Sequence, residues 1–253
     1  MSASPSFRSR LAAGETLLGT MLTLPEPAVA EILVDAGFDW LFIDGEHGPL
    51  ETRDILAILQ AVGGRTPCLV RVPGAAEAPI KRVLDLGADG IIVPQVNTAD
   101  EAARIVQWAR YAPEGSRGVG LARAHGYGRR FQEYVTTANE HTVVVVQAEH
   151  IRAVENIETI VQVPGVDAVL LGPYDLSASL GKMGQIDDPA VVAAIARVTA
   201  VCRDARMPLG CFGVTVAAVQ PLVDQGCTLV TAGVDTLLLG HAAGRLLEQL
   251  RKR

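Results

Sequence analysis

VVVVQAEH, residues 143–150, places four consecutive valines directly before an amide, a carboxylate and an imidazole. A run of β-branched apolar residues is typical of a strand buried on both faces, as in a parallel sheet covered by helices. Gln147 and Glu149 are two residues apart, so their side chains point to the same side of that strand. The stretch therefore predicts a buried parallel strand with polar groups at its carboxyl end.

Seven more runs of this kind occur along the chain. With residues 142–149 they make eight predicted strands, the others being 17–22, 40–44, 68–72, 90–94, 168–173, 209–212 and 228–233. Helical patterns separate them, at 27–37, 52–63, 80–87, 99–111 and 188–205. Residues 95–141 carry an extra loop and a second helix, and residues 172–206 carry a loop before their main helix.

This alternation predicts an α/β fold with a parallel sheet. Eight strand–helix units favour a closed (β/α)₈ TIM barrel, which commonly uses about 250 residues. A doubly wound sheet is the alternative, but no GxGxxG follows the first strand. No segment has the composition of a linker, so residues 1–253 are predicted to form one domain.

Composition narrows the classes of function. The chain is 49% hydrophobic and 4% aromatic, with a net charge of -6, which argues against a nucleic-acid binder. The Arg123, Arg129 and Arg130 cluster is interpreted as a solvated or subunit-facing loop rather than a phosphate site. No apolar run reaches the roughly 18 residues of a membrane span, and no signal peptide is evident. Four separated cysteines indicate a reduced, cytoplasmic protein.

The last predicted helix, residues 236–253, is strongly apolar for a terminal element. Gly240 and Gly244 are four residues apart, on one face, where small residues permit close helix approach. The helix either packs on its own barrel or docks on a neighbouring subunit, and the spacing leaves both open.

Polar side chains gather at the carboxyl ends of the predicted strands, where barrel active sites lie. They are Asp44, Glu46, His47, Arg71, Gln95, Gln147, Glu149 and Asp175. Singly, each has a structural explanation: Asp175 as a helix cap, Glu149 as a surface ion pair, His47 as a loop residue, and Arg71 as a partner for Asp44 or Glu46. Their occurrence at five successive strand ends favours a site.

The residue types suggest metal-assisted chemistry. Two carboxylates, Glu149 and Asp175, suit a hard cation such as Mg²⁺ or Mn²⁺ and leave positions open for substrate. Arg71 could neutralise an oxyanion, and His47 is the natural proton carrier. The three lysines, Lys81, Lys182 and Lys252, lie outside the strands, so Schiff-base catalysis is not supported. Neither a GxSxG motif nor a P-loop is present.

Five motifs together resemble the HpcH/HpaI family of metal-dependent pyruvate aldolases. They are FDWLFIDGEHGP (38–49), LVRVPG (69–74), LDLGADGIIVPQV (84–96), QAE (147–149) and LLGPYDLSASLG (170–181). The resemblance runs from about residue 11 to the end, and it is weaker for the citrate-lyase β-subunit branch. It implies a (β/α)₈ barrel, a last helix swapped between subunits, and homo-hexamers built as trimers of dimers.

The resemblance also implies roles for individual residues. Glu149 and Asp175 match the metal ligands, for Mg²⁺ or Mn²⁺ with Co²⁺ as a further candidate. Arg71 matches the arginine on the keto oxygen, and His47 the base that acts through water. The family supports that base with an aspartate from the adjacent subunit, matched by Asp85, while Asp44 matches an acidic residue of the same network. Gln147 matches a residue lining the pyruvate site, and Gly172 and Pro173 match the cradle of its carboxylate.

Phe212 falls at the end of the seventh strand, where the aldehyde pocket is expected. An aromatic ring there would narrow the pocket and disfavour long or charged aldehydes such as succinic semialdehyde. The alternative is a phenylalanine of the core.

The resulting hypothesis is reversible cleavage of 4-hydroxy-2-oxo acids to pyruvate and an aldehyde through a metal-bound pyruvate enolate. Oxaloacetate decarboxylation and acyl-CoA lyase activity are alternatives that use the same site. A non-catalytic barrel that binds keto acids is a third. Association with the family suggests degradation of aromatic compounds or sugar acids.

Overall fold

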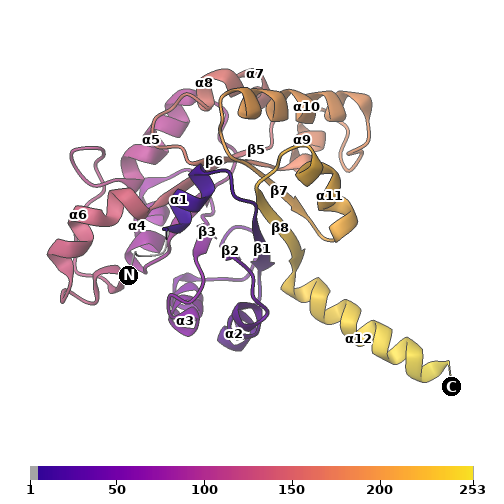
Figure 1. Cartoon of the computed structure of the whole chain (residues 1–253), viewed down its shortest axis with the longest axis horizontal. Coiled ribbons are helices and arrows are strands. Elements are labelled where there is room, and N and C mark those ends of the chain that lie inside the picture. The colour runs from indigo at the N-terminus through magenta and orange to yellow at the C-terminus, as the bar shows by residue number, and fades with distance from the viewer. Residues whose placement is uncertain (1–4, 253) are drawn as a thin grey trace.

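Strand follows helix along almost the whole of residues 5–252, the part of the chain that the computed structural model describes (Figure 1). The strands in that range are β1 (Leu17–Leu22), β2 (Trp40–Asp44), β3 (Cys68–Arg71), β4 (Gly90–Val93), β5 (Val143–Ala148), β6 (Ala168–Leu171), β7 (Leu209–Gly213) and β8 (Leu229–Val234). They form one closed barrel in sequence order, and every neighbouring pair is parallel. The predicted (β/α)₈ barrel is confirmed, and each predicted strand matches an observed one.

Most of the helices cover the outside of the barrel, while the first lies at its amino-terminal end and the last projects away from it (Figure 1). The helices are α1 (Phe7–Ala12), α2 (Pro27–Asp35), α3 (Thr52–Val62), α4 (Glu77–Asp85), α5 (Ala99–Ala109), the 3₁₀ turn η1 (Arg123–His125), α6 (Phe131–His141), α7 (Ile151–Glu155), α8 (Ile157–Ile160), α9 (Pro173–Ser179), α10 (Pro189–Asp204), α11 (Val216–Asp224) and α12 (Asp235–Arg251). The second helix predicted within 95–141 is α6. The predicted loop before α10 contains a short helix, α9, because Pro173 is placed at its first turn and Gly181 follows its end. None of the helices within residues 5–252 combines the length and apolar character needed to cross a membrane.

Two apolar clusters hold the barrel together. One lies between the sheet and its helices, and the other fills the barrel interior with Trp40, Phe42 and Leu170 among its members. Phe7 and Leu11 of α1 pack into the interior cluster beside Trp40, at the amino-terminal end of the strands. Gly19 is required there, because a Cβ atom at this position would lie 2.5 Å from the Trp40 ring. The amino-terminal end is therefore closed by apolar side chains, which leaves the opposite end for polar groups.

Helix α12 does not pack on its own barrel, so that interpretation of the terminal helix is wrong. Figure 1 shows it projecting away from the body of the molecule, and a Cβ at Gly240 or Gly244 would meet no atom within 4 Å. Only its base is anchored: the buried Asp235 carboxylate accepts from the backbone N–H groups of Thr23 and Leu24 at 2.9 and 2.8 Å. The rest of the helix exposes a set of leucines: Leu237, Leu238, Leu239, Leu246, Leu247 and Leu250.

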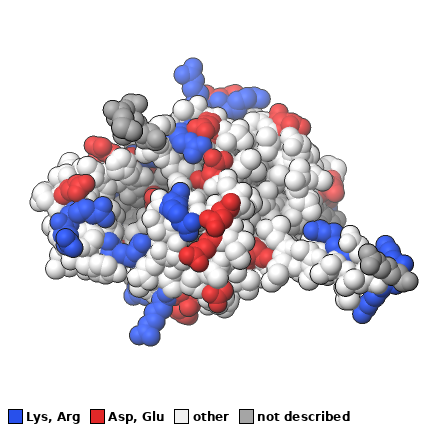
Figure 2. All heavy atoms as spheres, turned by 60° about the horizontal axis from the view of Figure 1, so that its bottom comes forward, with Lys and Arg blue, Asp and Glu red and all other residues white. Residues whose placement is uncertain are grey.

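Charges of both signs are interspersed on the face of the molecule shown in Figure 2. Uncharged surface separates them, and the projecting arm on the right is α12. This face therefore carries no continuous basic patch.

Candidate active site

The carboxyl end of the barrel brings together residues that lie far apart in the sequence. Asp44 at the end of β2 is in register with Arg71 at the end of β3. Gln147 and Glu149 come from the end of β5, and Asp175 comes from the first turn of α9, just after β6. The structure thus places these predicted site residues at one mouth.

Arg71 and Asp44 form a buried ion pair in this mouth. The Nε of Arg71 donates to Oδ1 of Asp44 at 2.8 Å, and its guanidinium lies 5.2 Å from the centre of the Phe42 ring. Burial would raise the pKa of Asp44, but the hydrogen bond and charge of Arg71, with two backbone N–H groups, bring this pKa below its ordinary value. Burial likewise opposes the charge of Arg71, yet the bond to Asp44 and the nearby carboxylates raise its pKa. Both groups are therefore held in their charged forms.

Glu46 also belongs to this cluster, although the sequence pointed to it only as a polar residue at the strand end, without a role in the chemistry of the site. Its Oε2 lies 3.2 Å from Nη1 of Arg71 and 3.7 Å from Nε2 of His47. Burial raises the pKa of Glu46, against the lowering effect of the Arg71 and His47 charges. The available signal was its position just after β2, two residues beyond Asp44, and the path of the turn then brings its carboxylate to Arg71.

Glu149 is the most perturbed carboxylate of the site. It is 3% exposed, and burial raises its pKa to about 7. The backbone N–H of Gln95 donates to its Oε1 at 2.8 Å and favours the charged form, whereas the negative charges of Asp175 and Glu46 disfavour it. Gln147 donates through Nε2 to the other oxygen, Oε2. A buried carboxylate facing two further carboxylates is an environment that a cation would stabilise.

The donor set fits a metal with two protein carboxylates. Asp175 is exposed in the first turn of α9, while Gly172 is the N-cap residue, so Asp175 is not the N-cap that the alternative interpretation required. The buried Oε1 of Gln147 has no hydrogen-bond partner within the described residues. In residues 5–252 no group of three or more His, Cys, Asp or Glu side chains is arranged to hold a metal ion. Glu149 and Asp175 would thus leave most coordination positions to water or substrate.

Gly172 makes room for this arrangement. A Cβ at this position would lie 2.6 Å from Cβ and 2.8 Å from Oε2 of Glu149. Gly172→Ala is therefore expected to displace Glu149 and to weaken Mn²⁺ binding by roughly 10- to 100-fold, measured by isothermal titration calorimetry. Gly74→Ala is the matched control, because a Cβ there would meet no atom within 4 Å. Equal Mn²⁺ affinities of the two variants would contradict this role.

His47 and Asp85 are not partners within one subunit. The His47 side chain is 67% exposed and approaches Glu46, while Asp44 accepts only from its backbone N–H, at 3.4 Å. Asp85 lies on α4, where Nη2 of Arg117 donates to it at 2.7 Å. Asp44 therefore positions the His47 backbone, and Asp85 stands outside the cluster around Arg71.

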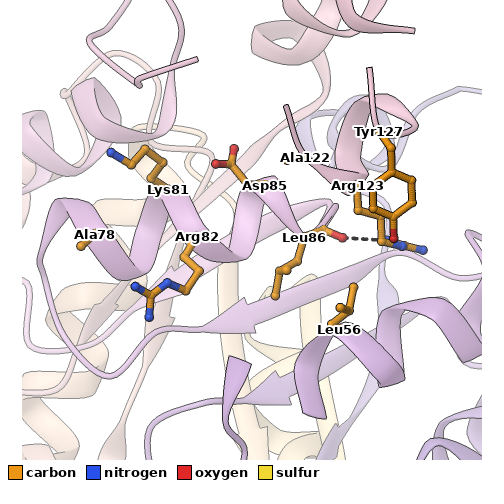
Figure 3. Close-up of a pocket in the computed structure, with 9 residues that line it drawn as sticks. All are labelled: Leu56, Ala78, Lys81, Arg82, Asp85, Leu86, Ala122, Arg123 and Tyr127. Carbon is orange, nitrogen blue, oxygen red and sulfur yellow. Dashed lines mark hydrogen bonds between the residues drawn. The ribbon is translucent and has the colours of Figure 1, made fainter. Parts of the chain in front are cut away.

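Asp85 borders a cavity of about 460 Å³ that lies between α4 and residues 122–127. In Figure 3 the Asp85 and Lys81 side chains lie on one side of this helix, and Leu86 and Leu56 lie on the other. Arg123 donates to the carbonyls of Leu86 and Leu59 at 2.7 and 3.0 Å. Arg123 is thus half-buried and binds carbonyl groups at the ends of α3 and α4, whereas Arg129 and Arg130 of the same predicted loop are exposed.

Phe212 contacts both the barrel core and a cavity. It packs, partly buried, against the cluster inside the barrel, and it also lines a cavity of about 570 Å³ together with Pro173. The ring is therefore a wall between the core and a space beside the mouth.

Comparison with known proteins agrees with this architecture. Residues 18–242 match the model of the family described as HpcH/HpaI aldolase/citrate lyase. A 4-hydroxy-2-oxovalerate aldolase of Rhodococcus jostii (strain RHA1) is 44% identical over 95% of this chain and 94% of its own. A hydroxypyruvate/pyruvate aldolase of Cupriavidus necator is 39% identical over 100% of this chain and 95% of its own.

A solved structure shows the same fold throughout. The crystal structure of an HpcH/HpaI aldolase/citrate lyase family protein from Burkholderia cenocepacia J2315 superposes with a TM-score of 0.93. It is 38% identical in sequence, and the match covers 96% of this chain and 98% of that one. The family model, the relatives and the structure agree, and the chain belongs to the HpcH/HpaI aldolase/citrate lyase family.

Proposed function

We propose that the protein is a divalent-metal-dependent aldolase that reversibly cleaves 4-hydroxy-2-oxo acids to pyruvate and an aldehyde. The observation that carries this proposal is the buried Glu149, beside Asp175 and Arg71 at one barrel mouth. The names of the relatives, 4-hydroxy-2-oxovalerate aldolase and hydroxypyruvate/pyruvate aldolase, support the same reaction class.

Glu149 and Asp175 would hold the metal, with Mg²⁺ or Mn²⁺ as the ions that suit oxygen ligands. When bound, the ion supplies Lewis-acid polarisation of the keto group. Gln147 lies beside these carboxylates and presents its buried, unpaired Oε1. Gly172 and Pro173, at the start of α9, would receive the pyruvate carboxylate near the positive end of this helix.

Arg71 is placed to stabilise negative charge on the keto oxygen. Its Nε and Nη1 bind Asp44 and Glu46, and within residues 5–252 its Nη2 makes no hydrogen bond. The two carboxylates fix the plane of the guanidinium, so the remaining N–H groups need no reorganisation when an enolate forms. The positive charge of Arg71 is thus directed at the position where the reaction develops negative charge.

His47 is proposed to move the proton, through a water molecule. In the direction of synthesis it takes a proton from the pyruvate methyl group, and the resulting carbanion carbon attacks the aldehyde carbonyl. A new carbon–carbon bond forms, and the former carbonyl oxygen takes up a proton as it becomes the 4-hydroxyl group. Cleavage follows the same steps in reverse. The exposed imidazole beside Glu46 is suited to this exchange.

Exchange of the pyruvate methyl protons with D₂O tests the proposal without any aldehyde. NMR is expected to show exchange with added Mn²⁺ or Mg²⁺ and none with chelator. His47→Gln is expected to slow the exchange by roughly 100- to 10,000-fold, while it spares oxaloacetate decarboxylation, which requires no methyl deprotonation. His141→Gln, on the exposed end of α6, is the matched control. Absence of exchange with every divalent metal would overturn the proposal.

We also propose that the subunits assemble as hexamers through α12, which is swapped between partners. The exposed leucines of this helix support the proposal, since Leu239 and Leu246 are 65% and 61% exposed and such surfaces are normally covered. Light scattering is expected to give six times the chain mass of 26.7 kDa. Replacing Leu239 and Leu246 by Glu should reduce that mass, and a monomeric wild-type protein would refute the assembly.

A further inference from the structure

The cavity of about 570 Å³ lined by Phe212 and Pro173 extends outward between α10 and α11. We refer to it as the outer groove. On the helices its lining includes Ile195 and Leu222, which are partly buried and pack against the apolar cluster between the sheet and its helices. Its size lies in the range of pockets that bind small molecules.

The outer groove begins at the mouth of the barrel. Phe212 lies near the carboxyl end of β7 and packs against the cluster inside the barrel, whereas Ile195 lies on α10, outside the barrel. Because the groove contacts both residues, it passes over the carboxyl end of β7. Pro173 and Tyr174 line the groove, and the next residue along α9 is Asp175. A Cβ on Gly172, the residue before Pro173, would lie 2.6 Å from Cβ of Glu149, so the start of α9 also borders the candidate metal ligand. One helical turn thus borders both the candidate metal site and the groove.

The lining of the groove is almost entirely apolar. Ile186, Val192 and Val214 expose 45%, 50% and 44% of their surface, a large fraction for such side chains. Among residues 5–252 the lining contains no lysine or arginine, and its one carboxylate is Asp187. An anionic group placed here would meet a negative charge and no cation, whereas a hydrocarbon chain would gain contact with apolar side chains.

We propose that the outer groove receives the tail of the aldehyde and selects uncharged hydrocarbon chains. This inference rests on the proposed aldolase function and names its substrate class. It retains the expectation that Phe212 disfavours charged aldehydes. It revises the expectation that Phe212 disfavours long ones, because the ring lines a cavity of about 570 Å³ in which a longer chain could lie.

The test compares two exposed alanines of α10. Ala196 lines the groove and Ala193 does not, so Ala196→Phe fills the groove and Ala193→Phe is the matched control on the same helix. The full chain with Mn²⁺ is assayed with pyruvate and acetaldehyde, butanal, hexanal or succinic semialdehyde. Exchange of the pyruvate methyl protons is measured in parallel for all three proteins.

For the wild-type protein kcat/KM is expected to rise about two- to fourfold per added methylene, with succinic semialdehyde below butanal. Ala196→Phe should remove this dependence on chain length, Ala193→Phe should preserve it, and methyl exchange should be unchanged in both. A flat profile with intact exchange in the wild type would overturn the inference alone. The inference would also be overturned if Ala196→Phe changed the molecular mass of the assembly but left the dependence of kcat/KM on chain length unchanged. That result would assign the groove to contact with a second copy of the chain. Loss of exchange in the wild type with every metal would instead overturn the aldolase function, and this inference with it.

Discussion

Glu149→Gln is expected to slow metal-dependent exchange of the pyruvate methyl protons strongly and, at the same time, to stabilise the metal-free protein above pH 7. The first effect follows from the loss of a negative ligand and should be roughly 100- to 1,000-fold. The second follows from the environment of Glu149, which is buried opposite Asp175 and Glu46. The new amide at position 149 can be accommodated, because the Gln147 side-chain amide can flip by about 180°. Its Oε1, which has no partner in the wild type, then accepts a hydrogen bond from the amide at position 149.

The pKa of Glu149 gives the sign and the pH range of the stability effect. Its pKa of about 7 in the folded protein exceeds the ordinary value of 4.5. Between these values the folded state binds more protons than the unfolded state, so stability falls as the pH rises. Above pH 7 the charged carboxylate costs up to about 3 kcal/mol in the absence of metal. The Gln variant has no such group and is expected to lose this pH dependence.

Urea unfolding with chelator at pH 5 and pH 8 measures the effect. The variant is expected to exceed the wild type in stability at pH 8 and to approach it at pH 5. Glu158→Gln is the control, because this exposed carboxylate pairs with Arg197 at the surface. If the Glu149→Gln protein were less stable than the wild type at pH 8, the charged Glu149 carboxylate would not destabilise the metal-free fold.

Arg71→Ala is expected to cost about 3–5 kcal/mol of unfolding free energy at pH 7, in addition to the catalytic activity. The reason is Asp44, which is 2% exposed and would keep its charge without a partner. Arg71 lowers the pKa of Asp44 below its ordinary value of 3.8. The ion pair therefore stabilises the folded protein fully above that pH, and this stabilisation is lost as the pH falls through the folded-state pKa of Asp44. The difference between variant and wild type should therefore shrink below about pH 4.

Arg65→Ala is the matched control for that measurement. Arg65 forms a comparable ion pair with Asp35, at 2.9 Å, but both side chains are largely exposed. Removal of this surface pair is expected to change stability by at most about 1 kcal/mol. Similar losses for Arg65→Ala and Arg71→Ala would show that burial of the Arg71–Asp44 pair is not the source of its effect.

The strands were predictable from the sequence because a barrel buries its strands on both faces. Residues 17–22 and 40–44 match β1 and β2 in full, since their apolar runs end where the chain reaches the surface. The short helices α9 and α11 were harder to predict. α11 contains Pro221 and α9 is only 7 residues long, so their patterns lack a clear helical period.

The positions of site residues at strand ends were predictable from the sequence, whereas the positions of those in loops were not. Asp44, Arg71 and Gln147 follow from the strand register, and Glu149 comes directly after β5. The path of residues 45–47 after β2 decides that Glu46 reaches Arg71 while His47 stays exposed, and no periodic pattern encodes such a turn. The partner of Asp85, Arg117, lies in the long connection between α5 and α6, which has no regular repeat.

The closing pair of the barrel joins the beginning of the chain to its end. β1 pairs with β8 from Leu17 and Leu229 onward, about 210 residues apart. During synthesis at 5–20 residues per second, β1 would therefore wait roughly 10 to 40 s for its last neighbour. Until then the strands leave two unpaired edges, which are prone to association with other chains. A ribosome that stops before residue 229 would release a chain that cannot close, and slower synthesis would lengthen the time during which both edges are exposed.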